Sequence, residues 1–349
     1  MTKYKVGVLG HYGGDRAFLD GQTIKTKSIT EQLCKELGAD QVLTADTYGG
    51  FRVLAKCLGA LLSMLAHCEN IIILPAQNGV KLFPGFLAFW NIFFRKQIHY
   101  VVIGGWLPSM ASQNPFLRLV LKRIDFIYVE TSTMKRALAE NGLSNVVILP
   151  NFKDIPILTE DKLVYPNGEP YRLCTFSRVM KEKGIEDAVE AVKAVNEKYG
   201  RTVYTLDIYG QVDSEQTKWF EDLKASFPDY VRYKGLVAYD KSVEVLKSYF
   251  ALLFPTYYDG EGFAGTLLDA MAAGVPVIAS DWKYNAEIVK PHKNGLLCDA
   301  KNVDALIIVL EYILKNRDEF SKMKKWCLED AKSFSPDLAI QPLISMIER

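Results

Sequence analysis

Glu261, Asp269 and several glycines stand close together in residues 254–281, FPTYYDGEGFAGTLLDAMAAGVPVIASD. Glu261 lies in a turn-rich loop, and Asp269 follows within a helical pattern that ends at Gly274. A glycine-rich loop that leads into a helix presents backbone N–H groups and the positive end of the helix dipole, which suits a phosphate. The two carboxylates beside it suit hydroxyl groups. Phosphate and hydroxyls together indicate a nucleotide-sugar as the ligand.

A second loop with chemically useful residues lies in TFSRVMKEKGI, residues 175–185. A strand is expected to end at Ser177 and a helix to begin at Gly184, so Arg178 and Lys183 fall in the connection between them. Arginine can bind two phosphate oxygens at once, and lysine supplies a mobile point charge. The pattern predicts a basic clamp for a diphosphate, although solvated loop charges are the simpler interpretation of the same residues.

The composition is that of a globular protein with two domains. The chain has 349 residues, of which 49% are hydrophobic and 24% charged, and this length exceeds the usual size of one hydrophobic core. A formal net charge of +1 gives no general case for nucleic acid as a partner. The six cysteines show no C-x-x-C or His/Cys ligand spacing, so we expect no metal and no disulfide framework. We also expect no signal segment and no membrane-spanning segment, and therefore a cytoplasmic protein.

Short runs of β-branched residues alternate with amphipathic stretches along almost the whole chain. This alternation predicts βαβ units and parallel sheets that are buried on both faces. Turn formers dominate between Pro150 and Pro170, which separates two domains. Helices are expected near 23–38, 51–67, 82–96, 114–124 and 132–141, and near 184–199, 214–226, 240–249, 265–273 and 302–315.

Residues 254–281 resemble the donor-binding signature of retaining glycosyltransferases of family 4, which have the GT-B fold. The signature is a glutamate, seven residues and a second glutamate, followed by a strand like GVPVIAS. Glu261 matches the first glutamate, and Asp269 stands in place of the second with a side chain one methylene shorter. The resemblance implies an α/β fold of two Rossmann-like, doubly wound parallel-sheet domains that face each other across a cleft.

The resemblance also implies domain boundaries and site residues. Residues 1–158 are expected to bind the acceptor, residues 159–334 the donor, and residues 335–349 to form a helix that crosses back to the first domain. The catalytic residues that it implies are Glu261, Arg178 and Lys183. The donor-binding residues that it implies are Gly13, Gly14, Gly210, Val237, Glu261, Gly262, Phe263, Ala264, Gly265, Thr266 and Asp269.

The first half of the chain departs from other nucleotide-binding patterns. The loop GHYGGD, in which His11 and Asp15 flank the glycine pair, has no G-x-G-x-x-G spacing, and this argues against a dehydrogenase. Many family members carry a histidine after the fourth strand, close to the donor sugar. This chain has Gly104, Gly105 and Trp106 there, so the resemblance carries no histidine-dependent mechanism over to it.

Together these features predict a metal-independent, retaining glycosyltransferase that needs no cofactor. It would move a hexose-type sugar from a nucleoside-diphosphate-sugar, with UDP as the expected nucleotide, to a hydroxyl of a growing glycan. Positioning and stabilisation of the departing diphosphate would supply most of the catalysis. A sugar-nucleotide 2-epimerase and a non-catalytic nucleotide-sugar-binding protein remain alternatives with the same fold.

Two neighbouring segments predict contact with a membrane surface. Residues 82–95, LFPGFLAFWNIFFR, are strongly aromatic, and NPFLRLVLKRID follows with Arg118, Lys122 and Arg123. Apolar and basic side chains together suit anionic lipid headgroups at the inner face of a cell membrane, beside a lipid-linked glycan acceptor. Burial of the aromatic helix within the domain is the alternative.

Overall fold

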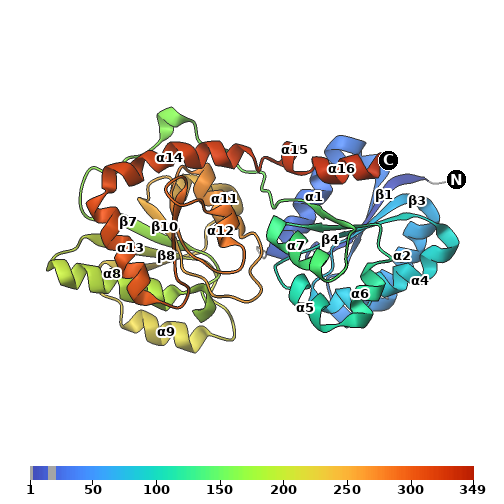
Figure 1. Cartoon of the computed structure of the whole chain (residues 1–349), viewed down its shortest axis with the longest axis horizontal. Coiled ribbons are helices and arrows are strands. Elements are labelled where there is room, and N and C mark those ends of the chain that lie inside the picture. The colour runs from blue at the N-terminus through green and yellow to red at the C-terminus, as the bar shows by residue number, and fades with distance from the viewer. Residues whose placement is uncertain (1–2, 15–20) are drawn as a thin grey trace. The chain divides into compact units, whose positions relative to one another are not determined.

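A computed structural model describes residues 3–14 and 21–349. It divides into two compact units, Met1–Asp154 with Phe334–Arg349 and Ile155–Ser333 (Figure 1). The division falls four residues before the one expected from the sequence, inside the same turn-rich segment. Asp15, expected to flank the glycine pair, lies outside the described residues.

The N-terminal unit is built on a parallel sheet with the strand order β2-β1-β3-β4-β5-β6. Its central strands are rich in buried apolar residues, because helices cover both faces of the sheet (Figure 1). The strands are β1 (Tyr4–Gly10), β2 (Val42–Asp46), β3 (Cys68–Ile73), β4 (Gln97–Val101), β5 (Phe126–Val129) and β6 (Val146–Ile148). The α-helices are α1 (Gly21–Leu37), α2 (Leu54–His67), α3 (Gln77–Val80), α4 (Phe83–Phe94), α5 (Leu107–Gln113), α6 (Pro115–Leu121) and α7 (Ser132–Glu140).

The C-terminal unit repeats this plan with the strand order β12-β11-β10-β7-β8-β9, again all parallel. The strands are β7 (Tyr171–Phe176), β8 (Tyr204–Tyr209), β9 (Val231–Gly235), β10 (Ala251–Phe254), β11 (Val277–Ser280) and β12 (Gly295–Cys298). The α-helices are α8 (Ile185–Tyr199), α9 (Thr217–Ala225), α10 (Ser242–Leu246), α11 (Gly265–Ala272), α12 (Asn285–Ile288), α13 (Val303–Lys315) and α14 (Arg317–Lys332). Short 3₁₀ turns at Lys181–Lys183 and Tyr239–Lys241 precede α8 and α10.

The last residues of the chain belong to the N-terminal unit. Helices α15 (Pro336–Ala339) and α16 (Gln341–Ile347) follow α14, and their apolar side chains join the core that contains Val6 and Val8 of β1. A surface ion pair of 2.6 Å between Lys35 and Asp337 adds to this contact. Burial of apolar area supplies most of the attachment, because an exposed ion pair contributes little.

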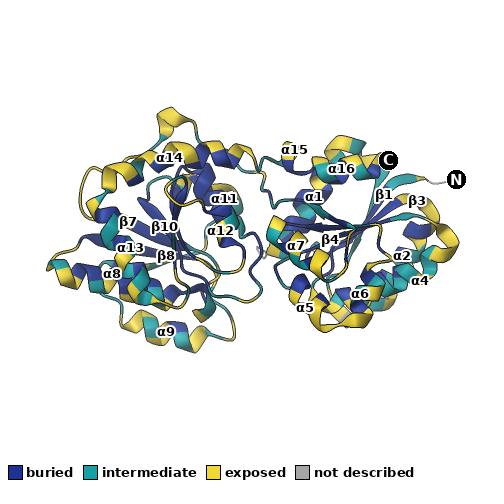
Figure 2. Ribbon diagram, viewed as in Figure 1, coloured by how far each residue is buried: buried dark blue, intermediate teal, exposed yellow. Residues whose placement is uncertain are grey.

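The expected α/β class with two doubly wound parallel sheets is confirmed, and Figure 2 shows the central strands of each unit buried. Among the described residues before 335, four helices were not expected: α3, α5, α12 and α14. A separate helix, α5, precedes α6, because Pro115 starts a new helix after Asn114, whose side chain accepts from the Leu117 N–H. The sequence reading assigns no helix to 316–334, where the structure has α14, the long helix that packs on α11.

Candidate functional site

The strand order of the C-terminal unit creates a switch point beside β7. The chain runs from β7 to β8 and β9 on one side of the sheet and then crosses to β10 on the other. The loops after β7 and β10 therefore leave the sheet in opposite directions, and ligands of doubly wound sheets bind at such a point. These two loops contain the predicted basic clamp and the predicted acidic loop.

Lys183 and Glu261 form a buried ion pair at this switch point. The Lys183 Nζ donates to Glu261 Oε2 over 2.6 Å, and the Thr256 hydroxyl donates to the same oxygen over 2.8 Å. The Lys183 ammonium also lies 5.4 Å from the Phe254 ring centroid and 5.2 Å from that of Tyr258. The structure thus brings together two predicted catalytic residues from different loops.

Two glycines allow these loops to approach one another. A Cβ atom on Gly184 would lie 2.2 Å from the carbonyl oxygen of Pro255, and one on Gly210 would lie 1.8 Å from that of Ser177. Both glycines also have positive φ angles, 68° and 135°, which favour glycine. Gly210, predicted to lie beside the nucleotide, therefore has a definite role in packing the loop after β8 against the loop after β7.

Arg178 lies on the same loop but is separate from the buried pair. Its guanidinium lies 3.5 Å from the carboxylate of Asp213 and 5.6 Å from the Tyr258 ring centroid. The side chain is half exposed, so it can turn towards a ligand with little cost in packing. Asp213 was not predicted; its position in the loop after β8 offers no sequence signal.

The start of α11 has the features of an anion site. Gly262, Phe263 and Ala264 lead into the helix, and Ala264 has no side-chain oxygen to cap its first N–H groups. The hydroxyl oxygen of Thr266, in the first turn, is buried without a hydrogen-bond partner in the described part of the chain. A buried polar atom without a partner is uncommon, and a bound anionic oxygen would satisfy it.

Asp269 is buried and connects two helices. Its Oδ1 accepts a hydrogen bond of 2.7 Å from the hydroxyl of Ser242, at the start of α10. This bond fixes the segment after β9 against α11, and Val237 lies half-buried in that segment. Asp269 and Val237, which are predicted to contact the ribose and the base, therefore lie in the same packed part of the C-terminal unit.

In the N-terminal unit, the glycine pair is held by an aspartate that sequence reasoning missed. Gly13 and Gly14 have positive φ angles of 86° and 56°. The Asp46 carboxylate accepts hydrogen bonds of 2.8 Å from the backbone N–H groups of Tyr12, Gly14 and Tyr48. Partial burial alone would raise the pKa of Asp46, but these three bonds outweigh it and lower the pKa. The D-T-Y-G-G turn after a strand was the available signal.

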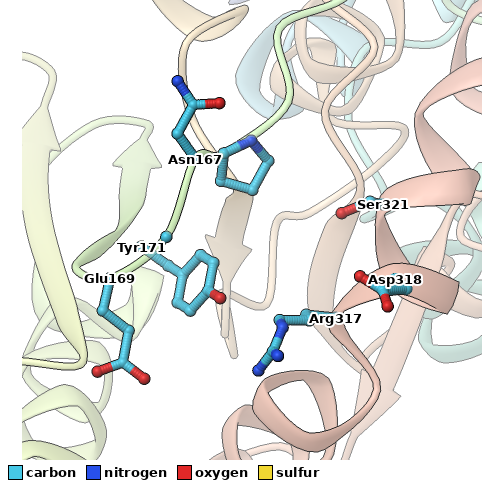
Figure 3. Close-up of a pocket in the computed structure, with 8 residues that line it drawn as sticks. Asn167, Glu169, Tyr171, Arg317, Asp318 and Ser321 are labelled. Atoms are coloured by element: carbon cyan, nitrogen blue, oxygen red, sulfur yellow. The ribbon is translucent and has the colours of Figure 1, made fainter.

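Two surface hollows lie outside the predicted site. One, of about 490 Å³, lies at the amino end of β7, where Tyr171, Arg317 and Ser321 surround a common space (Figure 3). The other, of about 520 Å³, lies between α8 and α9 and includes Lys181 and Trp219. The first is at the opposite end of β7 from the loops described above, so we assign it no part in the predicted chemistry.

Across residues 3–14 and 21–349, no group of three or more His, Cys, Asp or Glu side chains is arranged to hold a metal ion. Within the same ranges, every helix is too short or too polar to cross a bilayer.

The fold matches solved glycosyltransferase structures over nearly its whole length. HepE of Anabaena, in complex with UDP and glucose, has a TM-score of 0.75 and 13% identity, and the match covers 98% of this chain and 99% of HepE. The expected GT-B fold is therefore confirmed.

The sequence matches define a family for the C-terminal unit. Residues 159–329 match the family described as glycosyl transferases group 1, so the C-terminal unit carries a domain of that family. A UDP-N-acetylglucosamine–peptide N-acetylglucosaminyltransferase GtfA subunit of Streptococcus gordonii is 32% identical over 269 residues, 76% of this chain and 46% of the relative. A GDP-mannose-dependent phosphatidylinositol monomannoside mannosyltransferase of Mycobacterium tuberculosis is 28% identical over 232 residues, 61% of this chain and 58% of the relative. The chain thus spans about half the length of these curated relatives.

Proposed function

We propose that this protein is a retaining, metal-independent glycosyltransferase of family 4 that transfers a hexose-type sugar from a UDP-sugar to a hydroxyl of a growing glycan. The observation that carries the proposal is the buried Lys183–Glu261 pair at the switch point, 2.6 Å apart. The unpaired Thr266 hydroxyl at the start of α11 supports a phosphate beside it.

The proposed chemistry depends on charge at the leaving diphosphate. One N–H of the Lys183 ammonium bonds to Glu261, so its remaining N–H groups can bind phosphate oxygens. Arg178 turns from Asp213 to the same phosphates, and the α11 N-terminus adds its dipole. Glu261 holds sugar hydroxyls, while Asp269 contacts the ribose and Val237 the base.

UDP is the proposed nucleotide because two of the compared proteins point to it. The Streptococcus gordonii relative is described as using UDP-N-acetylglucosamine, and the HepE structure contains UDP. The Mycobacterium tuberculosis relative is described as GDP-mannose-dependent, so GDP is the alternative that a binding experiment must include.

Labelled UDP-sugars and GDP-sugars, incubated with and without a glycan acceptor, test the reaction. A new glycoside of unchanged anomeric configuration, formed in EDTA, is the expected product. An isomerised donor would indicate the 2-epimerase, and a donor that is bound but unchanged would indicate a binding protein. In the same assay, Glu261→Gln should lower kcat by about 100-fold or more and leave the Kd for free UDP nearly unchanged.

We further propose that the protein works at the inner face of the cell membrane, where its acceptor is lipid-linked. Helices α4 and α6 are in contact and expose apolar side chains next to basic ones. Phe93 is 71% exposed and Phe116 is 72% exposed. We define the aromatic patch as Phe89, Ile92, Phe93 and Phe94 of α4 with Phe116 and Leu119 of α6.

The patch is smaller than the sequence suggests, and two of the three predicted cations are exposed. Phe83 is buried in the unit, and Phe86 and Trp90 are half-buried. The Arg118 guanidinium donates to the carbonyl oxygens of Ala111 and Ser112 at the end of α5, which leaves Lys122 and Arg123 as the exposed cations that follow α6. Exposed aromatic groups beside cations favour an anionic bilayer surface over neutral lipid.

Liposome flotation tests this location. We expect binding to vesicles that contain phosphatidylserine but not to pure phosphatidylcholine, and loss of binding in the variant Lys122→Glu/Arg123→Glu. The matched control is Lys193→Glu/Lys198→Glu on α8, which makes the same charge change on the other unit. Failure to float with anionic vesicles at low salt would instead favour a soluble acceptor or a protein partner.

A further inference from the structure

The N-terminal unit contains a second buried Lys–Glu pair. Lys25 on α1 and Glu130, directly after β5, are both buried, at 6% and 5% exposure. The Lys25 Nζ donates to Glu130 Oε1 and, over 3.0 Å, to the carbonyl oxygen of Val102. Val102 directly follows β4. One lysine therefore joins α1 to the ends of two neighbouring strands.

The pair lies at the edge of the sheet where ligands bind. Glu130 and Val102 mark the carboxyl ends of parallel strands, and doubly wound sheets hold ligands at that edge. Val102 also opens the segment that continues through Gly104 to Trp106, where the sequence departs from the family's histidine. The same lysine thus fixes the start of that segment.

The buried face of α1 is unusually polar around this pair. Most of its buried residues carry hydroxyl, amide or amino groups, and two are aliphatic: Thr23, Lys25, Thr26, Ser28, Ile29, Thr30, Gln32 and Leu33. Thr26 is fully buried, and its hydroxyl has no hydrogen-bond partner among residues 3–14 and 21–349. It lies at the carboxyl end of β1, since a Cβ atom on Gly10 would meet it at 2.5 Å. A helix that packs only for stability buries an apolar stripe instead.

We propose that Lys25, Glu130 and Thr26 form the part of the N-terminal unit that binds the acceptor sugar through its hydroxyls; this inference rests on the glycosyl-transfer function proposed above. Between them, an ammonium and a carboxylate carry hydrogen-bond donors and acceptors. Sugar hydroxyls, which donate and accept, match that combination better than an anionic group does. Thr26 adds a hydroxyl whose hydrogen-bonding capacity is not used among the described residues.

A purely structural role for the pair predicts a different response to mutation. Removal of one partner leaves an uncompensated buried charge and destabilises the protein, whereas replacement of both by apolar residues of similar size is often neutral or stabilising. The double variant Lys25→Met/Glu130→Leu should therefore be as stable as wild type, whether or not the pair also binds the acceptor. It should bind the acceptor as wild type does only if the pair has no role beyond stability.

The experiment compares wild type, Lys25→Met/Glu130→Leu and Thr26→Val in the full chain. We measure Tm, the Kd for UDP, and KM for the acceptor that the wild-type protein glycosylates. We expect wild-type Tm and UDP affinity in both variants, with acceptor KM raised at least tenfold in the double variant and about threefold in Thr26→Val. Since Thr26→Val keeps the shape and removes only an unpaired hydroxyl, it decides the question if the double variant fails to fold.

Three outcomes distinguish failure of this inference from failure of the proposed transferase function. Transfer by the wild-type protein with unchanged acceptor KM in the folded variants overturns the acceptor site and leaves the transferase intact. Equal losses of UDP affinity and acceptor affinity also overturn it, because they indicate a general distortion. Absence of any transfer by the wild-type protein refutes the proposed function, and the acceptor site with it.

Discussion

Each unit carries a buried Lys–Glu pair at the carboxyl edge of a six-stranded parallel sheet, yet the two pairs are built differently. In the C-terminal unit, Lys183 and Glu261 come from two loops that glycines bring together. In the N-terminal unit, Lys25 comes from a helix face and Glu130 from a strand end. Loop-built sites leave a local signature of glycines and charges in the sequence, whereas a site that a helix face completes leaves none.

The anchoring of the loops differs in the same way. Gly184 and Gly210 permit backbone contacts among the loops of the C-terminal unit. The loop after β1 in the N-terminal unit is held by hydrogen bonds to the Asp46 carboxylate. The contacts at Gly184 and Gly210 require the absence of a side chain, whereas the hydrogen bonds that hold the loop after β1 require the Asp46 carboxylate. Substitutions at these glycines should therefore disturb the C-terminal unit, whereas a substitution at Asp46 should disturb the N-terminal unit.

The largest expected effect is that of breaking the pair in each unit. Lys183→Met and Lys25→Met should each lower the free energy of unfolding by about 3–5 kcal/mol, because a buried carboxylate loses its partner. Only Lys183→Met should weaken UDP binding, by roughly ten- to a hundredfold, as expected for the loss of charge-assisted bonds of about 1.5–3 kcal/mol.

Isothermal titration with UDP and denaturant unfolding check both effects. Lys181→Met is the matched control, because this exposed lysine lies two residues before Lys183 and its removal changes the net charge equally. A similar loss of UDP affinity in Lys25→Met would erase the proposed difference between the units.

Acid should destabilise the N-terminal unit through His99. Burial lowers the pKa of this histidine from 6.5 to about 4, while its Nδ1 lies 2.9 Å from the Tyr128 hydroxyl. Between pH 6.5 and 4 the unfolded chain binds a proton that the folded chain does not, so stability falls as pH falls. At 1.36 kcal/mol per pKa unit, the loss approaches about 3 kcal/mol near pH 4.

Hydrogen exchange at β4 and β5 amides, followed from pH 7 to 4, reports on the unit that contains His99. His99→Gln keeps a polar side chain without a titrating ring and should flatten this pH dependence. An unchanged slope in that variant would assign the acid sensitivity to other groups.

Alkaline pH should stabilise the C-terminal unit through Lys324, so that this lysine and His99 both make stability rise with pH. This lysine on α14 is fully buried and donates to the carbonyl oxygens of Tyr249 and Gly274. Burial lowers its pKa from 10.5 to about 8. Between pH 8 and 10.5 the unfolded chain holds a proton that the folded chain has lost, so this contribution raises stability with pH, by up to about 3 kcal/mol.

The difference in unfolding free energy between wild type and Lys324→Met isolates this term. Burial raises the pKa of Cys174 and Cys327 above this range in the folded state, and their titration in the unfolded chain is common to both proteins. That difference should grow in favour of wild type from pH 8 to 10. A constant difference over this range would contradict the prediction.

The smallest expected effect concerns the contact between loops. Gly210→Ala places a methyl group against the Ser177 carbonyl at positive φ and should cost about 2–3 kcal/mol of stability, with weaker UDP binding. Gly200→Ala is the control, because Gly200 also has a positive φ, 62°, but open space around it; there the strain alone costs about 1 kcal/mol. Thermal melts with and without UDP distinguish the two variants. Equal losses of stability and of UDP binding in both would show that the contact between Gly210 and Ser177 contributes to neither.

Much of the C-terminal unit was predictable because its features are local. The apolar face of α8 repeats at helical spacing, and every residue predicted on that face is buried. The clamp and the acidic loop lie at strand ends, where glycines mark the turns. The same regular spacing exists in α14, at Phe320, Met323 and Cys327, but frequent charges between these residues hide it.

The sequence alone determined the α/β class, the two-domain plan and the loops that carry Lys183 and Glu261, because alternating periodicity and glycine spacing are properties of neighbouring residues. Only the tertiary structure decided that Lys25 meets Glu130, that Asp46 holds the glycine pair, and that the Arg118 side chain caps α5. Those contacts depend on which strands become neighbours and how a helix is rotated over them. Strand order and helix rotation are set by packing of the whole unit, and no short stretch of sequence records them.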